Sequence, residues 1–460
     1  MNKTFQSFVF GCRVNEAERI QIDRQLIEAG YSVDLASPTF LIINSCAITG
    51  KAEREARQLI FQLKKQYPEA KIVFTGCVAT LWDKYSQNDT NLVDIIVPND
   101  KKSSLVSLLE KINCAPLATA SVARPNNDKF RHSNRLLVKI QDGCQRFCSY
   151  CIVPYLRGQP QSVRTVDIVQ YINSFLPVPS EVVLSAINTE AFGRDTGESL
   201  EGLIQAVLKS TQVLRLALGS VHPWSLTEDF LKFYENTLSQ EKRFVQFFHV
   251  PIQSGSQMVL NMMRREYSIH EVKNRLIQIA AISPSALIAT DIIVGFLGET
   301  DKLFEETYSF LEKSPINKFH VFRFSNRPHT AAFFMKKRID SMSLRSPLRR
   351  RIAICLHNEI ATSPGAPRND KECFEPTNEE KKVRSNRLIE LSKIKYQKFI
   401  ESQVGQTSRA LIVAKHKQGL KVLLDNQVEG ILKGKQYLPG SVVHVTIMSA
   451  KDCLVFCKES

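Results

Sequence analysis

Short apolar runs alternate with amphipathic stretches along the first part of the chain. The runs FQSFVF, FLIIN and KIVFT have the length and the β-branched or aromatic content of buried strands. Stretches with apolar positions at helical spacing, EAERIQIDRQLIEAG and AEREARQLIFQLKKQ, follow the first two runs. This alternation predicts an α/β domain with a largely parallel sheet over residues 1–115.

A polar segment over residues 116–133 is predicted to be a linker, because it is rich in Asn, Pro, Ser and charged residues. Six strand candidates separated by helical patterns follow it over residues 134–341: LLVKIQ, EVVLSAIN, LRLALGSV, FVQFFHVPIQ, ALIATDIIVGF and FHVFRFS. Repeated β/α units of this kind predict a partial (β/α)6 barrel. Its active site is expected at the carboxyl ends of the strands.

The last part of the chain is less uniform. Prolines, a glycine and a basic run interrupt residues 342–376, which predicts an exposed insertion. The charged stretch 377–401 reads as a connecting helix. Residues 402–460 alternate short β-rich runs with Gly, Asn and Asp turns, which predicts a small all-β barrel.

Charge and hydropathy limit the partners of the chain. Its 460 residues carry a formal net charge of +15, which favours a polyanionic partner, either nucleic acid or an anionic membrane. The start of the chain has no long apolar signal core, and no run reaches the roughly 18 apolar residues of a spanning helix. We therefore expect a soluble, cytoplasmic protein without a membrane partner.

Eleven cysteines in a large chain without an export signal are poorly explained by disulfides, so metal or catalytic use is the better interpretation. Three of them directly follow predicted strands of the first domain: Cys12, Cys46 and Cys77. Because the carboxyl ends of parallel strands meet at one edge of a sheet, these thiols can converge although they lie far apart in sequence.

A second set has the spacing C-x3-C-x2-C in the loop after a predicted strand: Cys144, Cys148 and Cys151. Structural zinc normally takes four ligands, and no fourth cysteine or histidine follows closely. An iron–sulfur cubane held by three thiolates instead keeps one iron free to bind another molecule. The alternative for either set is that the cysteines are small buried hydrophobic residues.

The remaining cysteines show no ligand pattern. Cys114 and Cys355 are interpreted as packing or near-surface residues, and Cys373 lies in the insertion. Cys453 and Cys457 form C-x3-C within the β-rich end, where strand packing is favoured over a second metal site because only two thiols are present.

The ordered motifs GCRVNEAE, INSCAITGKAEREARQ, FTGCVA, GCQRFCSYCIVPYLRG, VPIQSGSQMVLNMMRREY, DIIVGFLGET and SNRPHTAA carry a family resemblance. The chain resembles the radical S-adenosylmethionine tRNA methylthiotransferases. Among them it is most similar to the branch that acts on N6-threonylcarbamoyladenosine beside the anticodon. The resemblance covers nearly the whole chain apart from 342–376. It implies an N-terminal cluster domain, a radical enzyme partial barrel and a TRAM-like RNA-binding barrel.

The resemblance also implies two [4Fe-4S] clusters. Cys144, Cys148 and Cys151 would hold the cluster whose open iron chelates S-adenosyl-L-methionine, which is cleaved on reduction to a 5′-deoxyadenosyl radical. Cys12, Cys46 and Cys77 would hold an auxiliary cluster that carries the sulfur. The radical removes hydrogen from C2 of the adenine, and a second S-adenosylmethionine supplies the methyl group. The implied partners are tRNA, an electron donor protein and a sulfur donor.

Other site residues are predicted from their places in the pattern. Asn188, Ser220 and Gln253 end candidate strands and are predicted to line the S-adenosylmethionine site, although each position also suits an ordinary cap or turn. His222 stands where the family commonly has glutamate. Basic residues of the C-terminal segment are predicted to contact RNA phosphates: Lys415, Lys417, Lys433 and Lys435.

Three alternatives stay open from the sequence. The same chemistry on isopentenyladenosine in tRNA, or on a ribosomal protein side chain, would use the same cysteine motifs. An RNA-binding metal-cluster protein without radical activity is the alternative that is not an enzyme.

Overall fold

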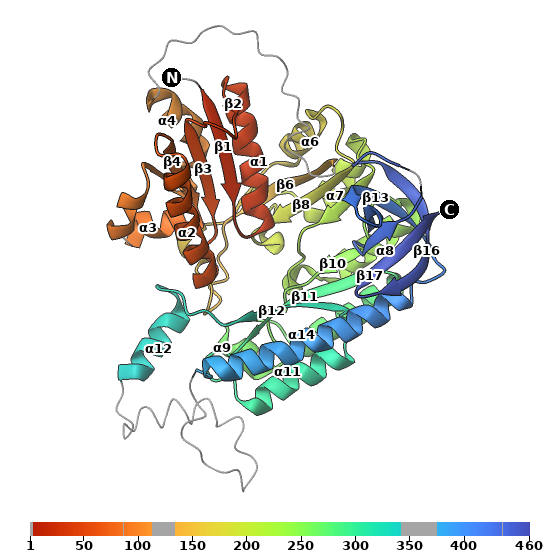
Figure 1. Cartoon of the computed structure of the whole chain (residues 1–460). Coiled ribbons are helices and arrows are strands. Elements are labelled where there is room, and N and C mark those ends of the chain that lie inside the picture. Colours follow the sequence, from red (N-terminus) through yellow and green to blue (C-terminus); the bar gives the residue numbers. More distant parts are fainter. Residues whose placement is uncertain (1–2, 86, 113–133, 342–374, 435) are drawn as a thin grey trace. The chain divides into compact units, whose positions relative to one another are not determined.

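Figure 1 shows the chain as a computed structural model, which divides into two compact units. The first unit contains residues 1–146 and 152–219, and the second contains 147–151 and 220–460. The structure describes residues 3–85, 87–112, 134–341, 375–434 and 436–460. Several predictions fall on residues outside this range: the linker 116–133, nearly all of the insertion 342–376, Lys435, Cys114, Cys355 and Cys373.

The first unit begins with a five-stranded sheet in which every pair of neighbours is parallel. Its strands, in the order β2-β1-β3-β4-β5, are Ser32–Val33, Thr4–Val9, Phe40–Ser45, Lys71–Gly76 and Ile95–Val97. The central strand β3 is buried along its whole length, as its unbroken apolar run predicts. The short outer strands β2 and β5 were not predicted from the sequence.

Helices cover both faces of this sheet, as Figure 1 shows. The helices are α1 (Arg13–Glu28), α2 (Gly50–Gln66), α3 (Cys77–Tyr85) and α4 (Leu105–Ile112), with the 3₁₀ segments Gln87–Leu92 and Asn99–Ser104. Apolar residues of α1 and α4 pack with one face, and those of α2 and α3 with the other. Burial of two apolar faces is what makes this a three-layer α/β domain.

A second sheet in the first unit has the order β7-β6-β8-β9. These strands are Gln161–Ser162, Arg135–Asp142, Glu181–Ala186 and Arg215–Leu218, with helices α5 (Val153–Arg157), α6 (Thr165–Asn173) and α7 (Leu200–Ser210) and the 3₁₀ turn Thr189–Ala191. Only the short β7 is antiparallel to its neighbour. Helix α1 packs against β6, so the cysteine-bearing domain and this sheet belong to one unit.

The second unit contains a parallel three-stranded sheet, β10-β11-β12. Its strands are Phe247–His249, Leu287–Val294 and Lys318–Arg323; its helices are α8 (Glu228–Gln240), α9 (Gln257–Met262), α10 (Ile269–Ile282), α11 (Asp301–Lys313), α12 (Ala331–Ser341) and α14 (Asn378–Glu401), with the 3₁₀ turn Pro223–Ser225. Figure 1 shows α14 alongside β12 and α11, which it contacts. The capping box of Thr377 and Glu380 begins α14.

The chain ends in a closed barrel with the order β13-β14-β15-β17-β16. The strands are Thr407–His416, Gly419–Leu424, Glu429–Leu432, Leu454–Glu459 and Val442–Lys451. Its core continues into Phe399 and Ile400 of α14 and Leu287 of β11, so the barrel shares a hydrophobic core with the second unit. Cys457 lies in this core, where burial raises the pKa of its thiol to about 12.

The predicted fold class is therefore confirmed. All six strands expected between residues 134 and 341 are present, three in each unit. The predicted small all-β barrel at the end of the chain is also present. Within the described ranges, no helix is both long and apolar enough to cross a membrane.

Candidate metal centres

Three cysteines lie at the carboxyl ends of neighbouring strands in the first sheet. Cys12 precedes α1, Cys46 directly follows β3, and Cys77 follows β4 as the first residue of α3. The order β1-β3-β4 brings these strand ends next to one another, as the sequence predicted. Cys46 and Cys77 are buried, and Cys12 is partly exposed.

Glycine allows two of these loops to approach closely. Gly11 has a positive φ of 99°, and a Cβ atom there would lie 2.2 Å from the Cβ of Cys46. Gly76 has a φ of 93°, and a Cβ there would lie 2.4 Å from the carbonyl oxygen of Ser45. Any other residue would be strained in its backbone and would push the cysteine loops apart.

The electrostatics of this site disfavour three free thiolates. Burial raises the pKa of Cys12 and outweighs the opposite effect of Arg157, and the neighbouring Cys77 raises this pKa further. Burial, followed by Cys77 and Cys12, raises the pKa of Cys46 to about 12. Thiolates gathered in a buried place repel one another unless a cation lies between them. The donor set of three soft sulfur atoms therefore fits an iron–sulfur cluster, whose irons would supply that positive charge.

Two hydrogen-bond donors point at the sulfur of Cys77. Arg157 donates from Nε over 3.3 Å, and Asn99 donates from Nδ2 over 3.6 Å. The Arg157 side chain is 1% exposed and comes from α5, six positions after Cys151. Donors of this kind stabilise negative charge on a thiolate ligand and tune the cluster that it would hold.

Arg157 is itself held by a buried ionic network. Its Nη1 lies 2.9 Å from Glu18 and 2.8 Å from Asp142. Lys102 and Lys139 also bind Glu18, at 2.6 Å and 2.9 Å. Burial raises the pKa of Glu18, but Arg157 and then the two lysines outweigh that effect and hold this pKa well below its usual range. The network thus fixes the guanidinium beside Cys77.

The second cysteine set lies in the loop after β6. Cys144 belongs to the first unit, where its amide donates to the carbonyl oxygen of Gly158 over 3.1 Å. Cys148 and Cys151 belong to the second unit, and the amide of Cys151 donates to the carbonyl oxygen of Cys148 over 2.9 Å. Ser149, between them, hydrogen-bonds to the carbonyl oxygens of Met262 and Met263. The loop is thus held on each side by backbone contacts.

A buried arginine also approaches this second set. Arg265 donates from Nη1 to the sulfur of Cys148 over 3.7 Å and from Nη2 to the carbonyl oxygen of Pro251 over 2.6 Å. Its guanidinium lies 4.4 Å from the ring centroid of Trp224 and 5.1 Å from that of Tyr267. Three thiols in a loop with a fixed cation nearby also fit a cluster ligand set.

The predicted cofactor residues lie at strand ends. Asn188 lines a pocket of about 420 Å³ in the first unit, together with Arg146 and Glu190, which form an ion pair at 2.9 Å. In the second unit, Ser220 lies 2.8 Å from Nδ1 of His249. The amide of Gln253, which has a positive φ of 69°, donates to the carbonyl oxygen of Asp291 over 2.9 Å. Ser220 and Gln253 therefore both contact the β10–β11 region.

His222 and the predicted RNA-contacting lysines lie elsewhere in the second unit. His222 stacks on Trp224 with ring centroids 6.4 Å apart. Lys415, Lys417 and Lys433 are exposed on the C-terminal barrel, and Lys433 lies over the ring of Phe456. Exposure is required for contact with phosphate, so these positions satisfy that requirement.

Sequence reasoning missed the charged residues around the cysteines. Arg157, Arg265 and Glu18 were not singled out, although all three lie within or beside the motifs quoted for the resemblance. Arg157 and Cys77 are 80 residues apart, and Arg265 and Cys148 are 117 residues apart. The arginine in the segment YLRG, directly after the cysteine loop, was the available signal.

Two family models match separate parts of the chain. Residues 4–98 match the model of Uncharacterized protein family UPF0004, and residues 138–311 match that of the Radical SAM superfamily. The solved radical S-adenosylmethionine methyltransferase TsrM from Kitasatospora setae, with cobalamin and a [4Fe-4S] cluster bound, has a TM-score of 0.53. It is 11% identical, and the match covers 75% of this chain and 80% of that one, which shows the fold.

Two sequence relatives are more informative. The threonylcarbamoyladenosine tRNA methylthiotransferase MtaB of Aquifex aeolicus is 30% identical over 435 residues, which are 91% of this chain and 95% of that protein. The protein of the same name from Thermotoga maritima is 32% identical over 342 residues, which are 73% of this chain and 77% of that protein. The chain therefore belongs to the radical S-adenosylmethionine tRNA methylthiotransferases, in the MtaB branch.

Proposed function

We propose that the protein is a transferase that replaces the C2–H of N6-threonylcarbamoyladenosine in tRNA, beside the anticodon, with a methylthio group. The observation that carries this proposal is the likeness to MtaB of Aquifex aeolicus, which extends over 95% of that protein. The convergence of Cys12, Cys46 and Cys77 at one sheet edge supports it, because the reaction needs a sulfur carrier in addition to a radical source.

The substrate explains why cofactors are needed. An aromatic C–H carbon has no acidic proton and no leaving group, so side-chain acids, bases and nucleophiles cannot replace its hydrogen. A reduced [4Fe-4S] cluster with bound S-adenosylmethionine supplies a 5′-deoxyadenosyl radical, which is a reagent able to remove that hydrogen atom. The protein contributes position and exclusion of water.

The cysteine sets are assigned separate tasks in this proposal. Cys144, Cys148 and Cys151 hold the radical-generating cluster, and Cys12, Cys46 and Cys77 hold the auxiliary cluster. Arg157 and Asn99 stabilise the negative charge on the sulfur of Cys77, and Arg265 does the same at Cys148. Asn188, Ser220 and Gln253 contact S-adenosylmethionine.

The remaining partners follow from the chemistry and the charge. Exposed Lys415, Lys417 and Lys433 contact tRNA phosphates. An electron donor protein reduces the radical-generating cluster, and a sulfur donor restores the sulfur that each turnover consumes.

The decisive experiment is mass spectrometry of tRNA nucleosides from cells with and without this protein. We expect the methylthio form of threonylcarbamoyladenosine to disappear with the protein and to return with the wild-type gene. Genes carrying Cys77→Ala or Cys148→Ala should not restore it. Loss of methylthiolation from isopentenyladenosine, or from a ribosomal protein, would instead assign one of the other two substrates.

Iron content tests the number of clusters separately. Anaerobic reconstitution should give about eight irons per chain for the wild type, and about four when either cysteine set is replaced by alanine. Incubation with S-adenosylmethionine and a reductant should release 5′-deoxyadenosine from the wild type. Binding of tRNA without any 5′-deoxyadenosine would support an RNA-binding cluster protein and would contradict the proposed enzyme.

A further inference from the structure

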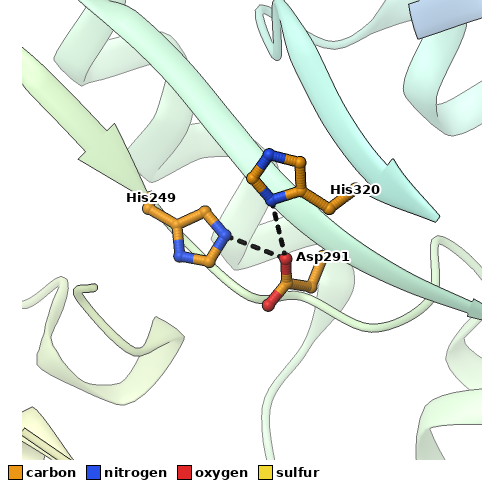
Figure 2. A group of neighbouring side chains, drawn as sticks. All are labelled: His249, Asp291 and His320. Carbon is orange, nitrogen blue, oxygen red and sulfur yellow. Dashed lines mark hydrogen bonds and ion pairs between the residues drawn. The ribbon is translucent and has the colours of Figure 1, made fainter. Parts of the chain in front are cut away.

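A cluster of two histidines and one aspartate lies on the β10-β11-β12 sheet and contains no cysteine. Figure 2 shows the imidazole rings of His249 and His320 directed at the carboxylate of Asp291. Asp291 and His320 are direct partners in the register of β11 and β12. His249 pairs with Ala289, two positions before Asp291, so all three side chains lie on one face of the sheet.

The distances within this cluster suit ligands that share an ion. Oδ1 of Asp291 lies 2.9 Å from Nε2 of His249 and 3.2 Å from Nδ1 of His320. One ligand atom from each residue lies within 4.8 Å of the other two. An ion with tetrahedral bonds of about 2.1 Å separates its ligand atoms by about 3.4 Å. Small adjustments of the side chains would therefore admit a metal ion.

A fourth residue orients the first ligand. Oγ of Ser220 lies 2.8 Å from Nδ1 of His249, the ring nitrogen that faces away from Asp291. Histidines that bind metals usually donate their other ring N–H to a neighbouring oxygen, which fixes the ring and its tautomer. In the metal-bound state, a proton on Nδ1 would be donated to Ser220, and the lone pair of Nε2 would bind the metal; without a metal, a proton on Nε2 is donated to Asp291 instead.

Burial and charge also favour an ion at this place. The side chains of His249 and Asp291 are 12% and 24% exposed, whereas His320 is 51% exposed. Oδ1 of Asp291 contacts both imidazoles, so an ion bound here would have one carboxylate ligand and two neutral imidazole ligands. The two inner ligands are thus fixed, and the outer side leaves room for water or another oxygen ligand.

We propose that His249, Asp291 and His320 bind one divalent transition-metal ion of the Zn²⁺ or Fe²⁺ type. Two imidazole nitrogens and one carboxylate suit these ions, whereas Mg²⁺ and Ca²⁺ prefer all-oxygen ligand sets. Three protein ligands leave at least one coordination position open, as in metal sites that bind a further ligand. This site does not depend on the proposed function of the cysteine sets.

The test uses the holoenzyme with its iron content measured, so that cluster cysteines are occupied. Equilibrium dialysis against Zn²⁺ should give about one zinc per wild-type chain without loss of iron. Asp291→Asn and His320→Ala each remove a ligand and should abolish or greatly weaken this binding. Ser220→Ala should weaken it about 10- to 100-fold, since Ser220 orients His249 and is not itself a metal ligand. His270→Ala is the control, because His270 is exposed on α10 outside the cluster.

X-ray absorption at the zinc edge identifies the ligands independently of affinity. We expect nitrogen and oxygen neighbours at about 2.0–2.1 Å and no sulfur at about 2.3 Å. Zinc bound to sulfur, no zinc binding by the holoenzyme, or binding equal in wild type, Asp291→Asn and His320→Ala would each overturn the proposal. Because His320 is half-exposed, His320→Ala is expected to fold and keeps the test valid if Asp291→Asn does not.

Discussion

The side chain of Arg157 both places a positive charge beside Cys77 and links two helices of the first unit. It is buried, it donates to the sulfur of Cys77, and its charge is matched by Glu18 and Asp142. Because it is in α5 and Cys77 begins α3, the contact joins two elements of the first unit. Its effect on the ligand sulfur should therefore be measurable apart from catalysis.

We predict that Arg157→Gln lowers the reduction potential of the proposed auxiliary cluster. Removal of a cation and an N–H donor leaves more negative charge on the ligand sulfur, which makes an added electron less favourable by on the order of tens of millivolts. The measurement is a redox titration followed by electron paramagnetic resonance, in a chain whose Cys144, Cys148 and Cys151 are alanine. Arg54→Gln on the exposed side of α2 is the control. An unchanged potential at full iron content would contradict this role.

Asp23 is a buried acid whose ionisation opposes folding. Burial raises the pKa of its carboxyl from 3.8 to about 6, despite the neighbouring Arg19 and Ser7. Between these two values the native state binds a proton that the unfolded state has released. The contribution of Asp23 to the free energy of unfolding therefore falls as pH rises through this window, by about 3 kcal/mol in all.

We predict that Asp23→Asn removes this pH dependence. The melting temperature of the variant relative to the wild type should rise as pH increases from about 4 to about 6, because only the wild type must ionise a buried acid. Thermal unfolding of the anaerobic holoenzyme at several pH values provides the measurement. For Asp83→Asn, at an exposed position of α3, the melting temperature should change with pH as it does in the wild type. The same pH dependence for Asp23→Asn and wild type would show that the Asp23 carboxyl does not have the raised pKa described above.

At the scale of elements, α14 is attached to the second unit by a buried ion pair. Arg384 is 7% exposed and lies 2.9 Å from Glu299 and 2.7 Å from Asp301. One turn along the same helix, Arg387 pairs with Glu305, but both side chains are about half exposed. The two arginines therefore offer a direct comparison of buried and exposed pairing.

We predict that Arg384→Leu lowers the free energy of unfolding by about 3–5 kcal/mol, because Glu299 is left buried without its cation. Arg387→Leu should cost no more than about 1 kcal/mol, since water solvates both groups. Denaturant unfolding, with tryptophan fluorescence as the signal, would compare the two variants. Equal decreases in the free energy of unfolding for the two variants would show that burial of the Arg384 ion pair does not determine how much it stabilises the protein.

The elements that could be predicted from sequence are those with a strong local pattern. Strands β1, β3 and β4 follow from their apolar runs, and α1 and α2 from helical periodicity. Strand β10 is shorter than its apolar run predicts. Pro251 lacks a backbone donor, and Gln253 has a positive φ, so regular pairing ends at His249 and resumes only as an isolated bridge.

The candidate sites could be predicted only in part for a related reason. Cysteine spacing and strand ends are local signals, so both cysteine sets could be identified from the sequence. The partners of those cysteines, and the pairing of His249 with Asp291 and His320, depend on register between strands that are distant in sequence. No local periodicity encodes that register, so these side chains became visible only in the folded chain.

At the scale of the whole molecule, the net charge of +15 should make the affinity for tRNA depend strongly on salt. We predict that the affinity for tRNA falls as salt increases, because bound phosphates release counterions. Replacing both Lys415 and Lys417 by alanine should reduce the slope of log affinity against log salt by about 1.4–1.8, corresponding to two lost phosphate contacts.

The control for that measurement replaces Lys64 and Lys65 on α2, which are also exposed but lie in the cysteine-bearing domain. Filter binding or fluorescence anisotropy at several salt concentrations would give both slopes. The same decrease in both double variants would indicate a general effect of net charge, and would argue against specific phosphate contacts on the C-terminal barrel.

The placement of Cys12 and Cys77 at the starts of helices has a further consequence. Cys12 is the N-cap of α1 and its side chain makes no capping hydrogen bond, while Cys77 is the first residue of α3. The amino end of a helix carries a partial positive charge from its unpaired backbone amides. Two of the three cysteines of this set therefore lie at the amino end of a helix, and this attraction for anions resides in the main chain. Substitution of Arg157 can weaken the preference of the site for negatively charged groups. No single side-chain change can remove this preference completely, because the backbone amides remain.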